Sequence, residues 1–293
     1  DGPGWTLIDT GLYSGLSKKI WTKLLGQRLG GRPLRGIIVT HYHPDHVGMA
    51  GWLVDNTGDE FWMPRTEWLY ARVLTIDDGD GFVDGMVEYY RRAGGSAEYL
   101  ARLKERGPFF PGIVSDVPRG IRRIRDGDSF DIGGTNWKIV VGNGHSPEHA
   151  CLLSDALGLF IAGDLVLPRL SPHIGVYADE PEANPLKDYL ETLDNFRTLP
   201  GDAIVLPSHN EPFHGLHERR EWLIQHHRDR LEDFVAACAT PTNAIAVARQ
   251  VFKRDLDSSQ LGFAAAETVA HLNYLIIQGR IRRHADETGV NLY

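Results

Sequence analysis

One nine-residue stretch, THYHPDHVG at positions 40–48, constrains this chain more than any other part of it. It follows an apolar run, 35–39, that has the β-branched bias of a buried strand. That order places the polar cluster at the carboxyl end of a strand, where α/β proteins keep their chemistry. Imidazole and carboxylate groups are ligands that borderline divalent metals prefer. The stretch therefore predicts a metal site built from His41, His43, Asp45 and His46.

Three later apolar segments also run out into His or Asp. A glycine-rich turn at 142–149 carries His145, and the strands expected at 159–162 and 203–206 are followed by Asp164 and His209. Seven protein ligands suit two metal ions with an open face between them, and one carboxylate can bridge the ions through both oxygens. The natural bridge is Asp164. The full set of expected ligands is His41, His43, Asp45, His46, His145, Asp164 and His209.

Composition narrows the class of protein. The chain has 293 residues, of which 42% are hydrophobic and 24% charged, as is ordinary for a soluble globular protein. Its net charge of −8 is opposite in sign to that of most proteins that track a phosphate backbone, so a nucleic-acid partner is disfavoured. Two cysteines, Cys151 and Cys238, are too few for a disulfide framework. No apolar run has the length of a membrane span, and no signal peptide is recognisable, so we expect a cytoplasmic protein.

The order of elements predicts a catalytic domain at 1–215 and a helical region at 216–293. Strands and helices alternate up to about residue 64, with a short helix expected over 47–54, as they do in βαβ units. A helical insertion is expected at about 64–120, and it would serve either as a lid or as a stabilising elaboration or dimer surface. The opening turn and strand suggest that a partner strand precedes this chain. Near its end, three helices and then a hairpin between 280–283 and 290–293 follow the order of a winged helix.

The motifs HxHxDH at 41–46, GHS at 144–146, GD at 163–164 and SH at 208–209 together resemble the metallo-β-lactamase superfamily. The similarity runs from about Trp5 to His214 and includes an early Asp-Thr-Gly at 9–11. It implies an α+β fold, an αββα sandwich with a dinuclear site in a cleft at one edge of the sheets. The segment 265–279 more weakly resembles the winged-helix-like region that some of these hydrolases carry.

By position, the resemblance assigns each ligand to an ion. It places His41, His43 and His145 on the first ion, places Asp45, His46 and His209 on the second, and makes Asp164 the bridge. Zinc is the expected metal, with iron and manganese as alternatives.

The resemblance also narrows the chemistry. Zinc β-lactamases lack an Asp at the bridging position, whereas glyoxalase II, lactonase, phosphodiesterase and ribonuclease relatives carry one, so Asp164 disfavours a β-lactamase. We expect a metal-dependent hydrolase in which a metal-bound hydroxide attacks an ester, thioester or lactone, with Asp45 or Asp164 moving the proton. A phosphodiesterase or nuclease using the same metals is one alternative. An iron-dependent oxidoreductase of the same fold is another, although His43 stands where that type usually has Glu.

Three further histidines lie near the expected site or in loops beside it: His149, His173 and His214. Each is interpreted either as a support for a ligand or substrate, or as an ordinary polar loop residue.

The expected partner of the chain is a small-molecule substrate. No membrane contact is expected, and a homodimer is one possible assembly.

Overall fold

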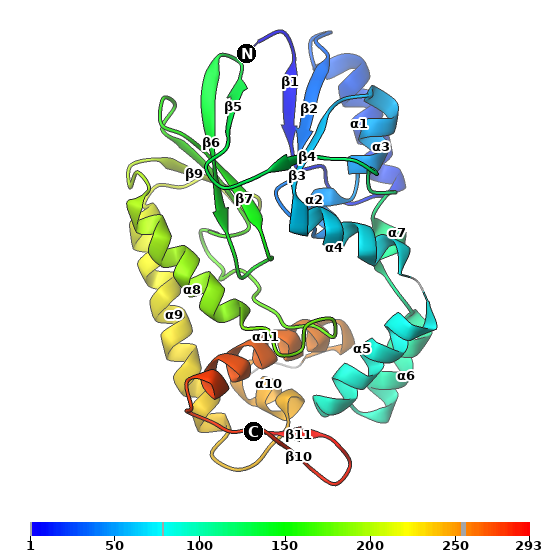
Figure 1. Ribbon diagram of the computed structural model, residues 1–293, viewed down its shortest axis with the longest axis vertical. Coiled ribbons are helices and arrows are strands. Elements are labelled where there is room, and N and C mark those ends of the chain that lie inside the picture. Colours follow the sequence, from blue (N-terminus) through cyan, green and yellow to red (C-terminus); the bar gives the residue numbers. More distant parts are fainter. Residues whose placement is uncertain (1, 78, 253–255) are drawn as a thin grey trace. The chain divides into compact units, whose positions relative to one another are not determined.

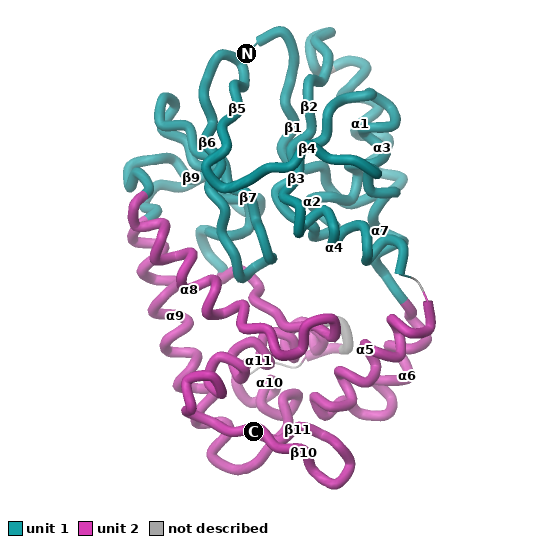
Figure 2. The backbone as a smooth tube through the Cα atoms, in the orientation of Figure 1, with its two compact units in different colours: residues 1–78, 108–170, 199–216 teal, residues 79–107, 171–198, 217–293 magenta. Residues whose placement is uncertain are grey.

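The computed structural model describes residues 2–77, 79–252 and 256–293, and the chain divides into two compact units (Figure 2). Unit 1 contains residues 1–78, 108–170 and 199–216, and unit 2 contains residues 79–107, 171–198 and 217–293. The segment expected as a helical insertion, about 64–120, is thus shared between the two units. The domain ranges 1–215 and 216–293 stay predictions.

The first half of unit 1 forms a parallel sheet, as the alternation of strands and helices predicts. Its strand order is β1-β2-β3-β4, and each neighbouring pair is parallel. In this order β1 lies at an edge of the described sheet. The strands are β1 (Trp5–Ile8), β2 (Leu34–Ile38), β3 (Phe61–Pro64) and β4 (Arg122–Ile124).

Helices cover one face of this sheet (Figure 1). Side chains alternate along β2, so Ile37 packs with Met49 and Leu53 in the helical layer while Ile38 points to the opposite face. The layer consists of α1 (Gly15–Lys23) with a π-helical turn at Leu24–Arg28, α2 (Pro44–Val47), α3 (Ala50–Thr57), α4 (Arg65–Ile76) and α7 (Phe110–Ile113).

The single helix expected over 47–54 was a wrong prediction, because the chain forms α2 and α3 there. The break comes at Gly48, where a side chain would lie 2.6 Å from the carbonyl oxygen of Gly11. The next residue, Met49, donates its N–H to that same oxygen at 2.9 Å. This close approach ties the end of α2 to the turn after β1.

The second half of unit 1 forms a mixed sheet in the order β5-β6-β7-β8-β9, antiparallel except for the last pair. Ile38 and Ile124 of the parallel sheet share a buried cluster with Trp137, Ile139 and Leu152 of the mixed sheet, so the two sheets face each other. The strands are β5 (Ser129–Ile132), β6 (Thr135–Gly142), β7 (His149–Ser154), β8 (Leu159–Gly163) and β9 (Ile204–Pro207).

Unit 2 is almost entirely helical. Its helices are α5 (Asp80–Arg92), α6 (Ala97–Arg106), α8 (Pro185–Asn195) with a 3₁₀ turn at Phe196–Thr198, α9 (Leu216–Ala237, whose first residue belongs to unit 1), α10 (Ala244–Phe252) and α11 (Ser258–Ile277). Within the described ranges, none of the helices combines the length and apolar character needed to cross a membrane.

The C-terminal hairpin exists, but its first strand lies further along than predicted. It pairs β10 (His284–Ala285) with β11 (Asn291–Leu292), whereas the expected first strand was 280–283. The reason is the end of α11. Gly279 has a φ of 70°, and the N–H of Arg280 donates to the carbonyl of Leu275, so these residues complete the helix cap instead of pairing.

We predict that Gly36→Ala destabilises the chain. Gly36 lies in β2 beneath the ring of Trp62, and an added Cβ would overlap that ring. Overpacking of this kind costs about 1–3 kcal/mol of unfolding free energy, measurable by denaturant titration. Gly15→Ala is the matched control, because a Cβ there meets no atom within 4 Å. Equal unfolding free energies for the two variants would contradict the described packing of Trp62 over Gly36 within the parallel sheet.

We also predict that unit 2 loses stability in acid. His227 and His271 are buried there with Nδ1 and Nε2 3.3 Å apart, and burial lowers the pKa of His227 to about 3. An unfolded His titrates near pH 6.5, so between about pH 6.5 and 3 the unfolded chain binds a proton that the folded chain does not. The unfolding free energy should therefore fall as pH drops, by up to about 1.4 kcal/mol per pH unit from this residue.

The variant His227→Gln should reduce this slope in denaturant titrations run at several pH values. An unchanged slope would show that His227 is not held neutral by burial.

Candidate metal centre

The seven predicted ligands come together within unit 1, at the ends of strands from both sheets. The loop after β2 supplies His41 and His43, and α2 supplies Asp45 and His46. The turn between β6 and β7 supplies His145, and the segments just after β8 and β9 supply Asp164 and His209. They form three overlapping clusters of mutually close donor atoms: His41, His43 and His145; His41, His46 and Asp164; and Asp45, His46 and His209.

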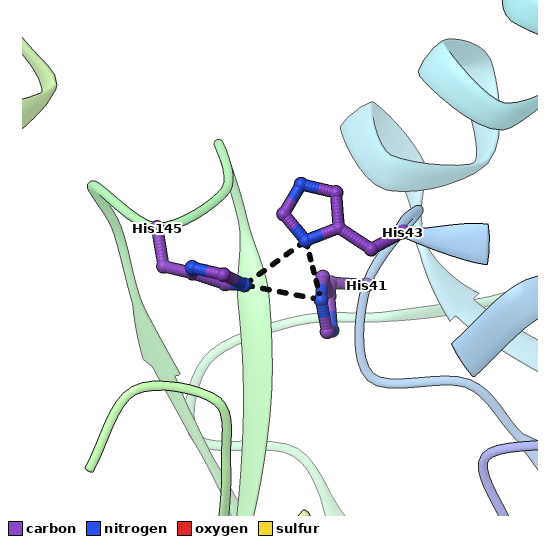
Figure 3. Close-up of side chains that lie close together, drawn as sticks. All are labelled: His41, His43 and His145. Atoms are coloured by element: carbon purple, nitrogen blue, oxygen red, sulfur yellow. Dashed lines mark hydrogen bonds between the residues drawn. The ribbon is translucent and has the colours of Figure 1, made fainter. Parts of the chain in front are cut away.

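The first group, His41, His43 and His145, points three imidazole nitrogens at one spot (Figure 3). His41 Nε2 and His43 Nδ1 lie 2.9 Å apart, His43 Nδ1 and His145 Nε2 lie 3.0 Å apart, and the third side of the triangle is 3.3 Å. Burial and the surrounding imidazoles hold the pKa of His41 well below its usual value, so this ring is neutral. The group therefore offers the neutral imidazole nitrogens that a divalent cation binds.

Asp164 lies between the first group and the second group, Asp45, His46 and His209. Its Oδ2 is 3.4 Å from His145 Nε2 and also 3.4 Å from His209 Nε2. Burial opposes ionisation of Asp164, but the neighbouring His145 and His46 outweigh it and hold the pKa of the carboxyl well below its usual range. An ionised carboxylate whose Oδ2 lies near a histidine of each group has the placement of a bridging ligand.

The separations between these donor atoms suit bound metal ions. Two ligands held about 2.1 Å from a tetrahedral ion lie about 3.4 Å apart, close to the separations found here. His46 Nε2 and Asp164 Oδ1 are buried, face each other at 3.5 Å, and have no hydrogen-bond partner among the described residues. Buried polar atoms are rarely left in that state, so they indicate an absent ligand that would satisfy both.

Asp9 orients His46 directly and His41 through Thr40. Its Oδ2 accepts hydrogen bonds from His46 Nδ1 at 2.8 Å and from the hydroxyl of Thr40 at 2.9 Å, and its Oδ1 accepts the Thr40 N–H. Thr40 Oγ1 in turn lies 2.9 Å from His41 Nδ1. Because the Nδ1 atoms of His41 and His46 face Asp9 or Thr40, the two Nε2 atoms are left to face the site. Asp9 adopts this position with a φ of 60°, which is strained for a residue other than Gly.

His149 supports Asp164. It is buried, and burial lowers its pKa to about 3, so its neutral Nε2 accepts the backbone N–H of Asp164 at 3.1 Å. Its ring also stacks on His41, with ring centroids 4.6 Å apart. Gly163 permits this approach, because a Cβ there would overlap the His149 ring. Of the two interpretations of His149, support for a ligand therefore agrees with the contacts.

The other two histidines, His173 and His214, have different surroundings. His173 belongs to unit 2, where its Nε2 is 2.9 Å from the hydroxyl of Tyr177 and its Nδ1 is 3.6 Å from Glu267. His214 is exposed.

Glu67 is a buried acidic residue beside the site that the sequence reasoning missed. It is 0% exposed, and burial raises its pKa to about 7 in spite of hydrogen bonds that favour the ionised form. Two of those bonds come from the turn that bears His145, through Ser146 and Glu148. In the sequence Glu67 resembles any acidic residue in the first turn of a helix, and only the position of that helix directly after a strand hinted at a role.

This chain belongs to the metallo-beta-lactamase superfamily. The model of that family matches residues 1–209, and the model of the metallo-beta-lactamase-like C-terminal domain matches residues 231–293. The expected α+β fold with a helical C-terminal region is thereby confirmed.

Solved structures agree with this assignment. A beta-lactamase domain protein from Burkholderia ambifaria is 37% identical with a TM-score of 0.90, and the match covers 99% of this chain and 83% of that one. A metallo-beta-lactamase family protein from Thermus thermophilus is 27% identical with a TM-score of 0.83, over 100% and 91%. Among curated proteins, a lactamase-like protein from Penicillium aethiopicum is 27% identical over 188 residues, 58% of each chain. The chain thus spans less than two thirds of that curated relative.

We predict that His145→Ala and Asp164→Ala lose bound metal without unfolding. His145 belongs to the first group only, so its loss should leave the binding of an ion at the second group unchanged. The loss of Asp164 should weaken ion binding at both groups. Metal content by inductively coupled plasma mass spectrometry, with circular dichroism as the folding check, measures this outcome. His284→Ala, on an exposed strand, is the control. Full metal content in both site variants would overturn the ligand assignment.

Proposed function

We propose that this chain is a dinuclear metal-dependent hydrolase that cleaves an ester, thioester or lactone. The observation that carries the proposal is the position of Asp164, whose carboxylate oxygen lies 3.4 Å from a histidine of each ligand group. Two divalent cations held by these groups would lower the pKa of a water molecule and polarise the carbonyl oxygen of a substrate. Zinc suits the nitrogen and oxygen donors, and iron and manganese are the alternatives.

The site has a buried side and a solvent-exposed side. His41 and His46 are 0% and 2% exposed and exclude water beneath the site. The side chains of Asp45 and His209 are 41% and 47% exposed, so a substrate reaches the site from their side. Asp45 Oδ2 lies 3.3 Å from His209 Nε2, and this half-exposed carboxylate is placed to accept a proton and pass it to a leaving group.

A carbonyl substrate is favoured over nucleic acid by charge. The net charge is −8, and α11, the helix that would recognise nucleic acid in a winged helix, carries no Lys or Arg along 258–277. Asp164 at the bridging position also separates this site from the pattern expected of zinc β-lactamases. We therefore expect a small-molecule substrate.

The test is a panel of substrates given to the metal-loaded protein. Lactones, acyl thioesters, simple esters, phosphodiesters, structured RNA and a β-lactam should be compared for turnover. We expect cleavage of one or more of the first three, and His145→Ala should reduce that cleavage to the rate without protein. Turnover restricted to RNA or phosphodiesters would replace this proposal with the nuclease alternative. Turnover that survives in His145→Ala would exclude catalysis at this site.

A further inference from the structure

We propose that Glu67 is a positioning residue that holds the first group, His41, His43 and His145, in its binding geometry before a metal ion arrives. The proposal rests on the proposed function, because it takes this group as a metal site. Glu67 is not itself among the clustered donor atoms. It acts on the backbone and side chains that carry them.

The carboxylate of Glu67 collects three donors. Its Oε2 accepts the backbone N–H of Tyr42 at 3.0 Å, and its Oε1 accepts the hydroxyl of Ser146 at 2.8 Å and the backbone N–H of Glu148 at 2.5 Å. All three donors come from outside α4, the helix to which Glu67 belongs. Both oxygens of the carboxylate are therefore used to bind other segments.

The donors lie in the two loops that carry the first group. Tyr42 stands between His41 and His43 in the loop after β2, and Ser146 directly follows His145 in the turn between β6 and β7. Strand β2 belongs to the parallel sheet, whereas β6 and β7 belong to the mixed sheet. Glu67 thus joins ligand loops from two different sheets through a single buried side chain.

A second carboxylate, that of Glu148, connects the same two segments, and here the acceptor lies in the turn after His145 and the donor lies in α4. Glu148 Oε2 accepts the backbone N–H of Thr66, in the first turn of α4, at 2.9 Å. Glu148 Oε1 also lies 3.5 Å from a guanidinium nitrogen of Arg123 on β4. The first turn of α4 and the turn after His145 therefore exchange hydrogen bonds, which fixes their separation.

An ordinary helix-capping role does not account for these contacts. An acidic residue in a first turn usually stays at the surface, where it interacts with the helix dipole or with N–H groups of its own helix. Glu67 is instead 0% exposed and accepts from two loops. A carboxylate buried this completely is retained only with a full set of partners, and here those partners are the ligand loops.

The first group needs such a restraint. Its three imidazole nitrogens approach within 2.9–3.3 Å, and the lone pairs that would bind a cation repel one another until the cation is present. If the loops relaxed apart, an arriving ion would have to reassemble them and would bind more weakly. Residues that orient metal ligands typically change metal affinity by about 10- to 100-fold when they are replaced.

The test uses Glu67→Gln. A Gln side chain has one acceptor oxygen, so its NH₂ group would face the N–H of either Tyr42 or Glu148 and release one loop. Ser146→Ala is the milder variant, because it removes one donor and keeps the carboxylate. Glu60→Gln is the matched control, since Glu60 is half-exposed near the amino end of β3 and pairs with Arg122.

The dissociation constants of Zn²⁺ for the metal-free proteins are measured by competition with a chromophoric chelator, alongside the unfolding free energy without metal. We expect Glu67→Gln to raise one dissociation constant by about 10- to 100-fold and to leave the other little changed. Ser146→Ala should raise the same dissociation constant by a smaller factor, and Glu60→Gln should change neither constant. In a His145→Ala background, adding Glu67→Gln should leave the remaining ion unaffected, because the group on which Glu67 acts is already broken.

The outcomes separate this proposal from the proposed function. If the wild-type chain binds no metal, the proposed function fails. If the wild type binds two ions and Glu67→Gln binds both as tightly, the positioning role is wrong. Equal weakening of both ions, together with a loss of stability without metal, would also overturn it in favour of a general structural role. Should Glu67→Gln not fold, the selective shift expected of Ser146→Ala decides the question.

Discussion

Unit 1 is organised around the close approach of seven nitrogen and oxygen donors, which lie together at the ends of its strands. Three imidazole nitrogens lie within 3.3 Å of one another, and two buried donor atoms face each other with no hydrogen-bond partner among the described residues. Burying polar groups that lack a full set of partners costs free energy unless a cation binds them or the scaffold restrains them. The arrangement can persist in the folded chain because rigid strands and buried supporting residues determine where every ligand lies.

The restraint comes from side chains that are themselves buried and hydrogen-bonded. Asp9 and Thr40 orient His41 and His46 from the end of β1, and His149 fixes the backbone of Asp164. Glu67 adds hydrogen bonds to two ligand loops, one that follows a strand of the parallel sheet and one between strands of the mixed sheet. These supports use strained or close-packed positions, such as the positive φ of Asp9. Such positions lower the folding stability and fix the geometry of the site.

The clustering of the seven candidate ligands could be predicted from sequence because each follows an apolar strand, and the carboxyl ends of strands meet at one edge of a sheet. The residues that support them could not. Glu67 carries no pattern of its own, and its partners are 25 and 81 positions away along the chain. The break between α2 and α3 was missed for a similar reason, because the contact of Gly48 with Gly11 depends on the tertiary fold. Local periodicity reports which face of an element is buried, but not which distant backbone atom approaches it.

The central claim is that this chain holds two metal ions bridged by Asp164. Anomalous X-ray diffraction from crystals of the metal-loaded protein, collected at the absorption edge of the bound metal, tests it most directly. We predict two anomalous peaks about 3.5–4 Å apart, one beside His145 and one beside His209, with Asp164 contacting both. A single peak, or peaks away from these residues, would contradict it.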